Sequence, residues 1–584
     1  MDKTYDVVII GSGISGALAA VELGKAGKKV LILEAGRDVR GIASRNLFTE
    51  NFYKETYKTP ESPYPDEQAC RHARTVDLFP DKGAYTGYLD QALPTSNKNF
   101  WFKSTNERLV GGTTWHWLGT CLQLLPTDFR MKSTYGIGSD WPIDYNDMLG
   151  WYKKAADAIG IAGDPHQDIL EKILKVPNVP YPMPEIPKSY LDRQYGDAID
   201  GHSVEIGVSG LDGLSYHVTS TPQARNSQPG YQGRPQCCGN SSCIPICPVG
   251  AKYDATYHIN LAVNQYGAVL QPQSVVTDFE ADDSGEVTRV NYLRWWDDAG
   301  TLQSAPGSVE APYFILAAHA IESAKILLSS TKNKKFAHGV GNTRSDGSEG
   351  VVGKYLMDHP CQLSWAQSNN PVFPFRGPIS TSGIETLREN SLRNKAGAFR
   401  IQIGNDGWIW PVGAPYGQVD SLMDAGMFGK ELYDNMQTQG VRQINLCALI
   451  EQEPNPNFSV TLSSQKDALG IQRPKIKYGL GAYETLGLVN AMRVHQQIFE
   501  MLGATGIQHK APQDFAGAGH ILGTAKMGTD EKDSVVNGNM MCHNHKNLMI
   551  LGSSTFPTEG TANPTFTIAA LALMASDHLI RVMK

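Results

Sequence analysis

Four cysteines fall within eleven residues of this chain, in the stretch Cys237-Cys238-Gly239-Asn240-Ser241-Ser242-Cys243-Ile244-Pro245-Ile246-Cys247-Pro248. Thiolates at this spacing suit an iron–sulfur cluster, because each iron needs soft sulfur ligands within a few ångströms. Two registers are open: Cys237, Cys243 and Cys247, or the same pattern with Cys238 first. Disulfides and zinc are the alternatives, but adjacent cysteines do not easily bond to each other and the paired Cys-x2-Cys spacing usual for zinc is absent. The pattern favours one-electron transfer chemistry.

A dinucleotide-binding pattern opens the chain. The apolar run Tyr5–Ile10 predicts a buried strand, Gly11-Ser12-Gly13-Ile14-Ser15-Gly16 follows, and a helix over 17–26 leads to a second strand that ends at Glu34. The three glycines permit a tight turn, close approach of the backbone to a pyrophosphate, and close packing of helix on strand. The helix start offers unpaired N–H groups to the phosphates, and Glu34 can accept hydrogen bonds from a ribose. This order predicts a βαβ unit that binds a flavin or nicotinamide dinucleotide.

Several polar residues elsewhere have types suited to catalysis. His520 lies in Gly517–Thr524, and histidine is the side chain whose ordinary pKa suits a general base near working pH. Asn563 precedes Pro564 and can donate a hydrogen bond without titrating, or it can cap the last helix. His116 lies between two tryptophans in the loop Gly111-Gly112-Thr113-Thr114-Trp115-His116-Trp117; a packed core histidine is one interpretation. We interpret His359 as structural, and His543 and His545 as part of a solvated turn.

The bulk composition is that of a globular protein. A length of 584 residues exceeds what one core usually supports, so two joined domains are expected. A formal net charge of -7 argues against nucleic acid or an anionic membrane surface as the main partner. No apolar run approaches the ~20 residues of a bilayer span, and the chain enters a strand at once, so no signal peptide is expected. Five further cysteines are interpreted as small buried side chains: Cys70, Cys121, Cys361, Cys447 and Cys542.

The elements that must position these residues alternate between strands and helices. Buried strands are predicted over 268–271, 274–279, 287–296, 313–318 and 548–551, and helices over 145–162, 320–329, 484–502 and 564–583. Alternating patterns over 443–450 and 457–462 favour strands of one antiparallel sheet. Residues 40–100 show no clear periodicity and indicate long loops. The fold class is therefore α/β, with a Rossmann-like unit and a second domain built on an antiparallel sheet.

Together these features resemble the glucose–methanol–choline (GMC) oxidoreductases along nearly the whole chain. The N-terminal βαβ unit, the Gly111-Gly112 loop, the strand and helix of Leu316–Leu328 and the C-terminal Asn563-Pro564 occur in the family's order. The cysteine stretch, Lys354-Tyr355-Leu356-Met357-Asp358-His359-Pro360 and Gly519-His520 resemble a narrower branch, the catalytic subunits of bacterial FAD-dependent glucose, fructose and sorbitol dehydrogenases.

The resemblance implies a domain division and the cofactors. Residues 1–150, 237–345 and 511–584 would form the FAD-binding domain and carry the cysteine stretch, and residues 151–236 and 346–510 would form the substrate-binding domain. FAD would contact two groups of residues, with His116 in a position where some relatives bond the flavin covalently. For His116 we favour this covalent bond over the packed core histidine. The residues are Gly11, Gly13, Gly16 and Glu34 for the ADP half, and Gly111, Gly112, Thr113, Thr114, His116 and Asn563 beside the flavin ring. A three-iron, four-sulfur cluster would be held by Cys237, Cys243 and Cys247, leaving Cys238 spare.

The resemblance also implies the reaction and the partners. His520 would be the base and Asn563 its partner in oxidising a sugar or polyol hydroxyl to a carbonyl, with electrons passed through the cluster to a cytochrome c. An oxidase that uses oxygen is the enzymatic alternative; a non-catalytic electron-transfer or scaffold subunit is disfavoured because both His520 and Asn563 are present. We expect a small companion subunit with an export signal, a cytochrome c subunit, and a place on the periplasmic face of the inner membrane, with membrane contact only through a partner. A cytoplasmic enzyme is the alternative.

Overall fold

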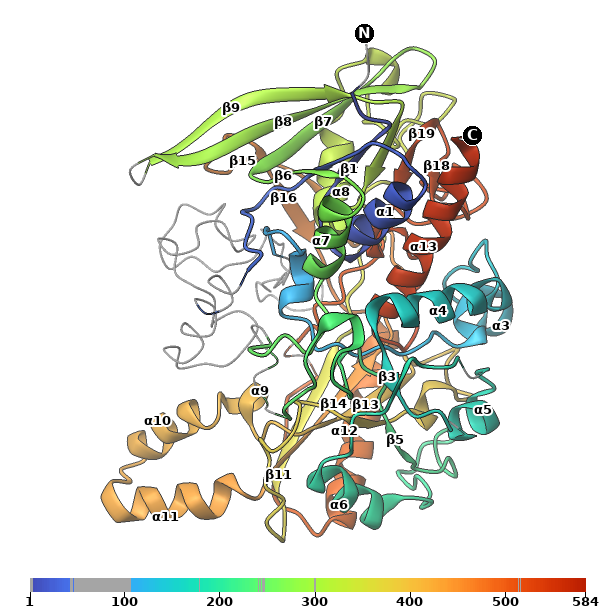
Figure 1. Cartoon of the computed structure of the whole chain (residues 1–584). Helices are drawn as coiled ribbons and strands as arrows, with labels where there is room; N and C mark the ends of the chain where they lie inside the picture. The colour runs from blue at the N-terminus through green and yellow to red at the C-terminus, as the bar shows by residue number, and fades with distance from the viewer. Residues whose placement is uncertain are drawn as a thin grey trace.

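The computed structural model describes residues 4–41, 46 and 107–583, except 167, 178, 240, 242, 244–246, 299–300, 513 and 515. Two six-stranded sheets organise these residues, one near the two termini and one at the opposite end of the molecule (Figure 1). Cys70 and nearly all of the segment 40–100 lie outside the described residues.

The first sheet has the strand order β18-β19-β10-β1-β2-β6. Its central strands run parallel, with Ile10 of β1 level with Leu33 of β2 and Leu316 of β10. Only β18 runs antiparallel, beside β19. Parallel strands covered on both faces are fully apolar, which explains why the run in β1 is entirely buried. The strands are β1 (Val7–Ile10), β2 (Val30–Leu33), β6 (Val269–Gln271), β10 (Tyr313–Leu316), β18 (Met541–Cys542) and β19 (His545–Ile550).

Helices pack on this sheet and on one another. The helix α1 (Ile14–Lys25) contacts α7 (Thr256–Asn264) and α13 (Thr565–Val582), and α13 also contacts α4 (Tyr145–Ile159). Within the described residues, α13 is the one helix long and apolar enough to cross a membrane, yet 61% of it is buried inside the protein. It serves here as a core helix. The helix α8 (Ala320–Ser329) follows β10 and completes this layer.

The second sheet has the order β17-β11-β14-β13-β12-β5 and is antiparallel throughout. The helix α12 (Ala482–Met501) covers β11 and β14, and buries Val494 and Ile498. The strands are β5 (Val218–Ser220), β11 (Cys361–Gln367), β12 (Ser382–Ile384), β13 (Phe399–Gly404), β14 (Gln443–Ile450) and β17 (Thr505–His509).

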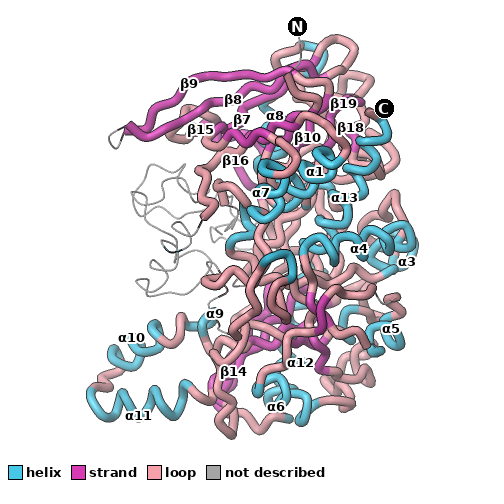
Figure 2. The backbone as a smooth tube through the Cα atoms, viewed as in Figure 1, coloured by secondary structure: helices cyan, strands magenta, loops and turns pink. Residues whose placement is uncertain are grey.

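The remaining elements lie around these two sheets. Two helices, α10 and α11, stand away from the body as an arm (Figures 1 and 2). The other strands are β3 (Ala162–Gly163), β4 (Met183–Pro184), β7 (Ser274–Ala281), β8 (Val287–Asp298), β9 (Thr301–Glu310), β15 (Ser459–Lys466) and β16 (Gln472–Lys477). The other helices are α3 (Met131–Tyr135), α5 (Asp168–Leu174), α6 (Tyr190–Ile199), α9 (Ile409–Val412), α10 (Tyr416–Asp424) and α11 (Gly429–Gly440).

The α/β class with an added antiparallel sheet is confirmed. One strand was assigned to the wrong sheet: the segment 457–462 forms β15, which pairs with β16 in a separate two-stranded sheet. Alternation reveals which face of a strand is buried but not which strand lies beside it. Every strand of the first sheet comes from the segments predicted to bind FAD, and every strand of the second from the segments predicted to bind substrate. The residue boundaries of the two domains stay a prediction.

Candidate active site

A cavity of about 290 Å³ lies at the carboxyl ends of β1, β2 and β10. This is the edge of a parallel sheet where α/β proteins bind their ligands. The cavity unites residues that are distant in the sequence, among them Gly13, Glu34, His116, His520 and Asn563. Most of the predicted cofactor residues therefore share one space with the predicted catalytic residues; Gly16 and Gly111 are not part of the cavity lining.

The first glycine turn has the geometry that a dinucleotide requires. Gly11 has φ +98°, and a Cβ there would lie 2.5 Å from the carbonyl oxygen of Ala317. A Cβ at Gly16 would lie 2.1 Å from the carbonyl oxygen of Gly11, so this glycine permits the close packing of α1 on β1. A Cβ at Gly13 would meet no protein atom within 4 Å. Gly13 is the N-cap of α1 and lines the cavity, so it leaves room for a phosphate at the helix start.

Glu34 anchors this turn. Its Oε2 accepts hydrogen bonds from the backbone N–H of Ser12 at 3.0 Å and from Ser12 Oγ at 2.6 Å, and its Oε1 accepts one from the N–H of Gly36 at 2.9 Å. Burial raises the pKa of Glu34 despite these bonds. The carboxyl group lines the cavity at the end of β2, where a ribose hydroxyl can donate to it.

The second glycine loop lies directly against the first. Gly111 has φ +100° and donates its N–H to Ser12 Oγ at 3.1 Å. A Cβ at Gly112 would lie 3.4 Å from the Cα of Gly13. Thr114 Oγ1 donates to the carbonyl of Gly111 at 2.6 Å and accepts the N–H of Ala255 at 2.9 Å. Gly112, Thr113 and Thr114 all line the cavity, as predicted for residues beside a flavin.

His116 lines the same cavity and is 5% exposed. Its Nδ1 lies 3.5 Å from Glu107 Oε1. Burial, together with the charge of Lys252, lowers the pKa of His116 to about 3, so the ring is neutral at working pH. A neutral imidazole facing the cofactor space has the lone pair that a covalent bond to a flavin would need.

Asn563 and Arg400 determine which ring nitrogen of His520 carries the proton. Arg400 is fully buried, pairs with Glu385 at 2.9 Å and donates from Nη1 to Asn563 Oδ1 at 3.2 Å. The amide Nδ2 of Asn563 therefore faces His520 Nε2, at 3.2 Å, and donates to it. An amide donor at this position leaves the lone pair of His520 on Nε2 and its proton on Nδ1. Burial lowers the pKa of His520 well below its usual value, so the imidazole is available as a base.

His359 is in direct contact with the predicted base. The two Nδ1 atoms lie 3.1 Å apart, and the rings meet edge to face. His359 Nδ1 also lies 2.8 Å from Glu559 Oε1, and its Nε2 donates to the carbonyl of Gly560 at 3.0 Å. Asp358 Oδ1 accepts the backbone N–H of His520 at 2.8 Å. The sequence analysis treated His359 as structural and did not single out Glu559. For His359 the available signal was its place within the motif Asp358-His359-Pro360.

The cysteine site is built around a buried cation. Arg225 donates from Nη1 to Cys243 Sγ at 3.2 Å, and the charges of Cys243, Cys237 and Cys247 offset burial and raise the pKa of Arg225. Cys243 and Cys247 are buried, Cys237 is half-buried and Cys238 is exposed. Within the described residues, however, no three histidine, cysteine or carboxylate side chains come close enough together to hold a metal ion. The thiols share one cation, but the geometry shown does not form a cluster cage.

Two interpretations from the sequence were wrong, one for Asn563 and one for His545. Asn563 does not cap α13, whose N-cap is Pro564; its side chain contacts Arg400 and His520 instead. His545 is not in a solvated turn but is fully buried in β19, where its Nδ1 donates to the carbonyl of Gly285 at 2.7 Å. Local sequence fits both a cap and an active-site amide, and only the packing of β13 against this loop decides between them.

A buried charge cluster at the cavity wall was also missed. Glu322 of α8 accepts from Arg108 at 2.8 Å and from Lys325 at 2.5 Å. Burial alone would raise the pKa of Glu322, but Arg108 and Lys325 outweigh it and lower the pKa to about 2. Arg108 and Glu322 line the cavity, and no motif marks either residue in the sequence.

Comparison with known proteins agrees with this geometry. Residues 6–73 match the sequence profile of FAD dependent oxidoreductases, and residues 454–572 match that of GMC oxidoreductases. The fructose dehydrogenase large subunit of Gluconobacter japonicus is 33% identical, over 99% of this chain and 98% of that protein. The protein belongs to the GMC oxidoreductase family.

Other relatives of this GMC oxidoreductase are more distant. The paromamine 6'-oxidase of Streptomyces fradiae is 25% identical over 98% of this chain and 91% of that protein. The gluconate 2-dehydrogenase flavoprotein of Pantoea cypripedii is 22% identical over 97% of this chain and 92% of that protein. The crystal structure of a pyridoxine 4-oxidase superposes with a TM-score of 0.61, covering 98% of this chain and 99% of that one, at 15% identity, which supports the fold alone.

Proposed function

We propose that this GMC oxidoreductase is a dehydrogenase that oxidises a hydroxyl group of a sugar or polyol to a carbonyl. The observation that carries the proposal is the contact of Asn563 Nδ2 with His520 Nε2 at 3.2 Å, between two residues that both line the dinucleotide cavity. FAD, when bound, supplies the hydride acceptor for the C–H bond of the substrate. The residues around the cavity fit that cofactor, since Gly13 leaves room for a phosphate and Glu34 faces the cavity.

The protein's own groups handle the hydroxyl. When the substrate enters, Asn563 Nδ2 donates its hydrogen bond to the substrate oxygen instead of to His520 Nε2, which orients the C–H bond and frees the Nε2 lone pair. His520 Nε2 then accepts the hydroxyl proton. Arg400 keeps the amide in this orientation through Asn563 Oδ1. His116 is proposed to bond the flavin, because its neutral ring lies at the cavity wall.

The names of the relatives support a sugar or sugar-like substrate. One relative is a fructose dehydrogenase subunit and another a gluconate 2-dehydrogenase flavoprotein. A panel of D-fructose, D-glucose, D-gluconate and D-sorbitol, with an artificial electron acceptor, tests the substrate class. Turnover of at least one member is expected; absence of turnover with all four, in protein that holds its flavin, would contradict the proposal.

We further propose that electrons leave towards the cysteine site and not to oxygen. Leu118 and Trp410 line the cavity and also pack against the small hydrophobic cluster of Cys243 and Ile379, which supports a short route between the two sites. A three-iron, four-sulfur cluster on Cys237, Cys243 and Cys247 is proposed from the residue types, with the exposed Cys238 spare. An oxidase that reduces oxygen is the second candidate, because a paromamine 6'-oxidase is among the relatives. Comparing rates with oxygen and with a cytochrome c separates the two.

Partner subunits complete the proposal. The fructose dehydrogenase relative, at 33% identity, is named a large subunit, which supports a hetero-oligomer with a small companion subunit and a cytochrome c acceptor. We propose that the complex works on the periplasmic face of the inner membrane and contacts the membrane only through a partner. Fractionation of native cells with a tagged chain tests this: activity confined to the cytosol, with no co-purifying subunit or haem, would refute it.

A further inference from the structure

We propose that Lys252 is a positioning residue for His116, which it keeps within reach of the flavin by binding the main chain on both sides of the histidine. The inference rests on the proposed bond between His116 and the flavin. Lys252 is not among the described residues that line the cavity, so it acts on the cofactor only through the loop that carries His116.

The ammonium group of Lys252 binds three backbone carbonyls. Its Nζ donates to the carbonyl oxygen of Trp115 at 2.9 Å and to that of Cys243 at 3.0 Å. It also donates to the carbonyl oxygen of Trp117. An ammonium has three N–H donors, so each donor has an acceptor. Trp115 and Trp117 are the two neighbours of His116 in the chain, and one nitrogen atom therefore fixes the main chain on both sides of the histidine.

The burial of Lys252 indicates that these donors are needed. The side chain is 2% exposed, and its three acceptors are uncharged carbonyl groups of the main chain. Carbonyl oxygens satisfy the donors but do not neutralise the charge, and a buried ammonium without a neutralising partner costs free energy. A methionine would fill the same space without that cost. We therefore attribute the lysine to the carbonyls that it binds and not to packing.

The residues that follow Lys252 hold side chains of the same loop. Trp117 Nε1 donates to the carbonyl of Tyr253 at 2.7 Å, and Thr114 Oγ1 accepts the N–H of Ala255 at 2.9 Å. These two bonds fix a tryptophan and a threonine side chain, whereas Lys252 binds the peptide groups on both sides of the histidine. Without the ammonium, those buried carbonyls lose their donor and the two peptide groups can turn. The imidazole would then shift at the cavity wall.

The third acceptor connects this loop to the cysteine stretch. Lys252 binds the carbonyl of Cys243. Arg225, which lies opposite Lys252 in an antiparallel β-bridge, donates to the carbonyl of Leu118 at 2.7 Å. Arg225 also donates to Cys243 Sγ at 3.2 Å. Two buried cations therefore hold the loop beside the flavin and the backbone of Cys243 together, and loss of Lys252 should loosen both.

The placement of His116 matters because the proposed bond forms only when the reacting atoms are close. A ring nitrogen of His116 supplies the electron pair of the new bond to a methyl carbon of the flavin. The methyl carbon and the imidazole each lose one hydrogen as a proton, and the two electrons left behind pass to the proposed cytochrome c acceptor. A misplacement of about 1 Å can cost about 100-fold in rate. Loosening should therefore impair this bond more than cofactor binding, to which Gly13 and Glu34 also contribute.

Lys252→Met tests the inference, with Lys526→Met as the control. Lys526 is 5% exposed, and its Nζ lies 3.5 Å from Ser139 Oγ and 4.3 Å from the ring centre of Tyr355. Total flavin and the flavin that survives acid precipitation are measured in each purified holoenzyme. Lys252→Met should keep most of the total flavin, but its acid-stable share should fall by about tenfold or more. Lys526→Met should keep the acid-stable share of the wild type.

Amide hydrogen exchange in the flavin-loaded proteins is a second measurement, and it does not depend on the covalent bond. In Lys252→Met, peptides that cover residues 115–118 and Cys243 should exchange faster than in the wild type. Residues 7–16, which form the first strand and glycine turn, should exchange as in the wild type. Lys526→Met should leave all three regions unchanged.

Wild-type exchange at residues 115–118 in Lys252→Met, or a wild-type acid-stable share, would overturn the inference. A loss of total flavin with faster exchange at residues 7–16 would also overturn it, because Lys252 would then be a general stabilising residue. A wild type whose flavin is all released by acid would refute the bond from His116 and the positioning role together. Failure to turn over any sugar, in an enzyme that gives the expected flavin results, would refute the proposed dehydrogenase and not the role of Lys252.

Discussion

Arg400→Lys should show whether Arg400 supports activity by orienting Asn563, in addition to stabilising the substrate-binding sheet. A lysine ammonium can keep the charge opposite Glu385, but it lacks the planar fork that reaches both Glu385 and Asn563. The lost bond leaves Asn563 Oδ1 without its donor in a buried position. The amide can then turn and present its oxygen to His520 Nε2. That arrangement favours a proton on Nε2, and His520 in this state cannot accept the substrate proton.

The size of the effect follows from the contact removed. Leaving a buried acceptor unsatisfied costs about 1–3 kcal/mol. If this free energy appears in the population of the correct amide orientation, kcat/KM falls by about 5- to 160-fold, since 1.36 kcal/mol is a factor of ten. KM should change little, because the hydrogen bond to the substrate oxygen survives in the remaining correctly oriented fraction.

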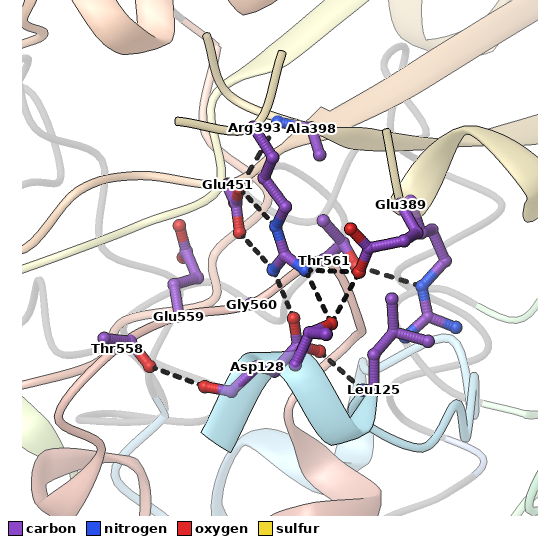
Figure 3. A network of polar contacts seen from close by, with 12 residues as sticks. Leu125, Asp128, Glu389, Arg393, Ala398, Glu451, Thr558, Glu559, Gly560 and Thr561 are labelled. Carbon is purple, nitrogen blue, oxygen red and sulfur yellow. Dashed lines mark hydrogen bonds and ion pairs between the residues drawn. The ribbon is translucent and has the colours of Figure 1, made fainter. Parts of the chain in front are cut away.

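Steady-state kinetics with an artificial acceptor, together with thermal unfolding, provide the assay. The control is Arg393→Lys, which perturbs an equally buried arginine that pairs with Asp128 and Glu451 and has no contact with Asn563 (Figure 3). Both variants should lower Tm, and only Arg400→Lys should lower kcat/KM. Equal losses of kcat/KM in both, or an unchanged kcat/KM in Arg400→Lys, would refute the reasoning.

Three further changes test other parts of the site. If His116 carries the flavin covalently, acid precipitation leaves yellow colour in the pellet and His116→Ala releases it; free flavin in the wild type would disprove the bond. Cys243→Ser should lose bound iron and electron transfer to cytochrome c, while reduction of the flavin by substrate survives. Cys238→Ser should keep both the iron and the electron transfer. Iron retained in Cys243→Ser contradicts the ligand assignment. Arg108 and Lys325 outweigh burial and hold the pKa of Glu322 at about 2 against an ordinary 4.5, so this group stabilises the fold above about pH 4.5 and the stabilisation, about 3 kcal/mol, is lost as pH falls towards 2. Glu322→Gln should flatten the acid limb of the unfolding free energy measured in urea, and an unchanged acid limb would refute this.

The parts of the fold set by local sequence could be predicted. The strand, glycine turn and helix of residues 7–25 follow from apolar runs and glycine conformations, which depend on neighbours in the chain. Helix α8 was predicted over the same residues, 320–329, that the structure shows. The partner of β15 could not be predicted, because pairing depends on segments distant in sequence.

The site was predictable only in part for the same reason. His520 and Asn563 belong to motifs, and the structure brings them to 3.2 Å. His359 belongs to the motif Asp358-His359-Pro360, but local sequence does not show which side chain it contacts; folding brings it, from 161 residues away, against His520. Arg400 is a buried cation in a strand, where a sequence pattern would place an apolar residue or an exposed charge.

The central claim is that His520 removes the substrate proton beside a bound flavin. The most direct measurement is the rate of flavin bleaching by the best sugar, without oxygen, in the wild type and in His520→Ala of equal flavin content. The account predicts that the wild type bleaches rapidly and that the variant is slower by about 10²- to 10⁴-fold, the usual contribution of a positioned base. A variant that keeps more than about a tenth of the wild-type rate would contradict it. A loss smaller than tenfold is less than about 1.4 kcal/mol of transition-state stabilisation, which one ordinary hydrogen bond could supply without proton transfer.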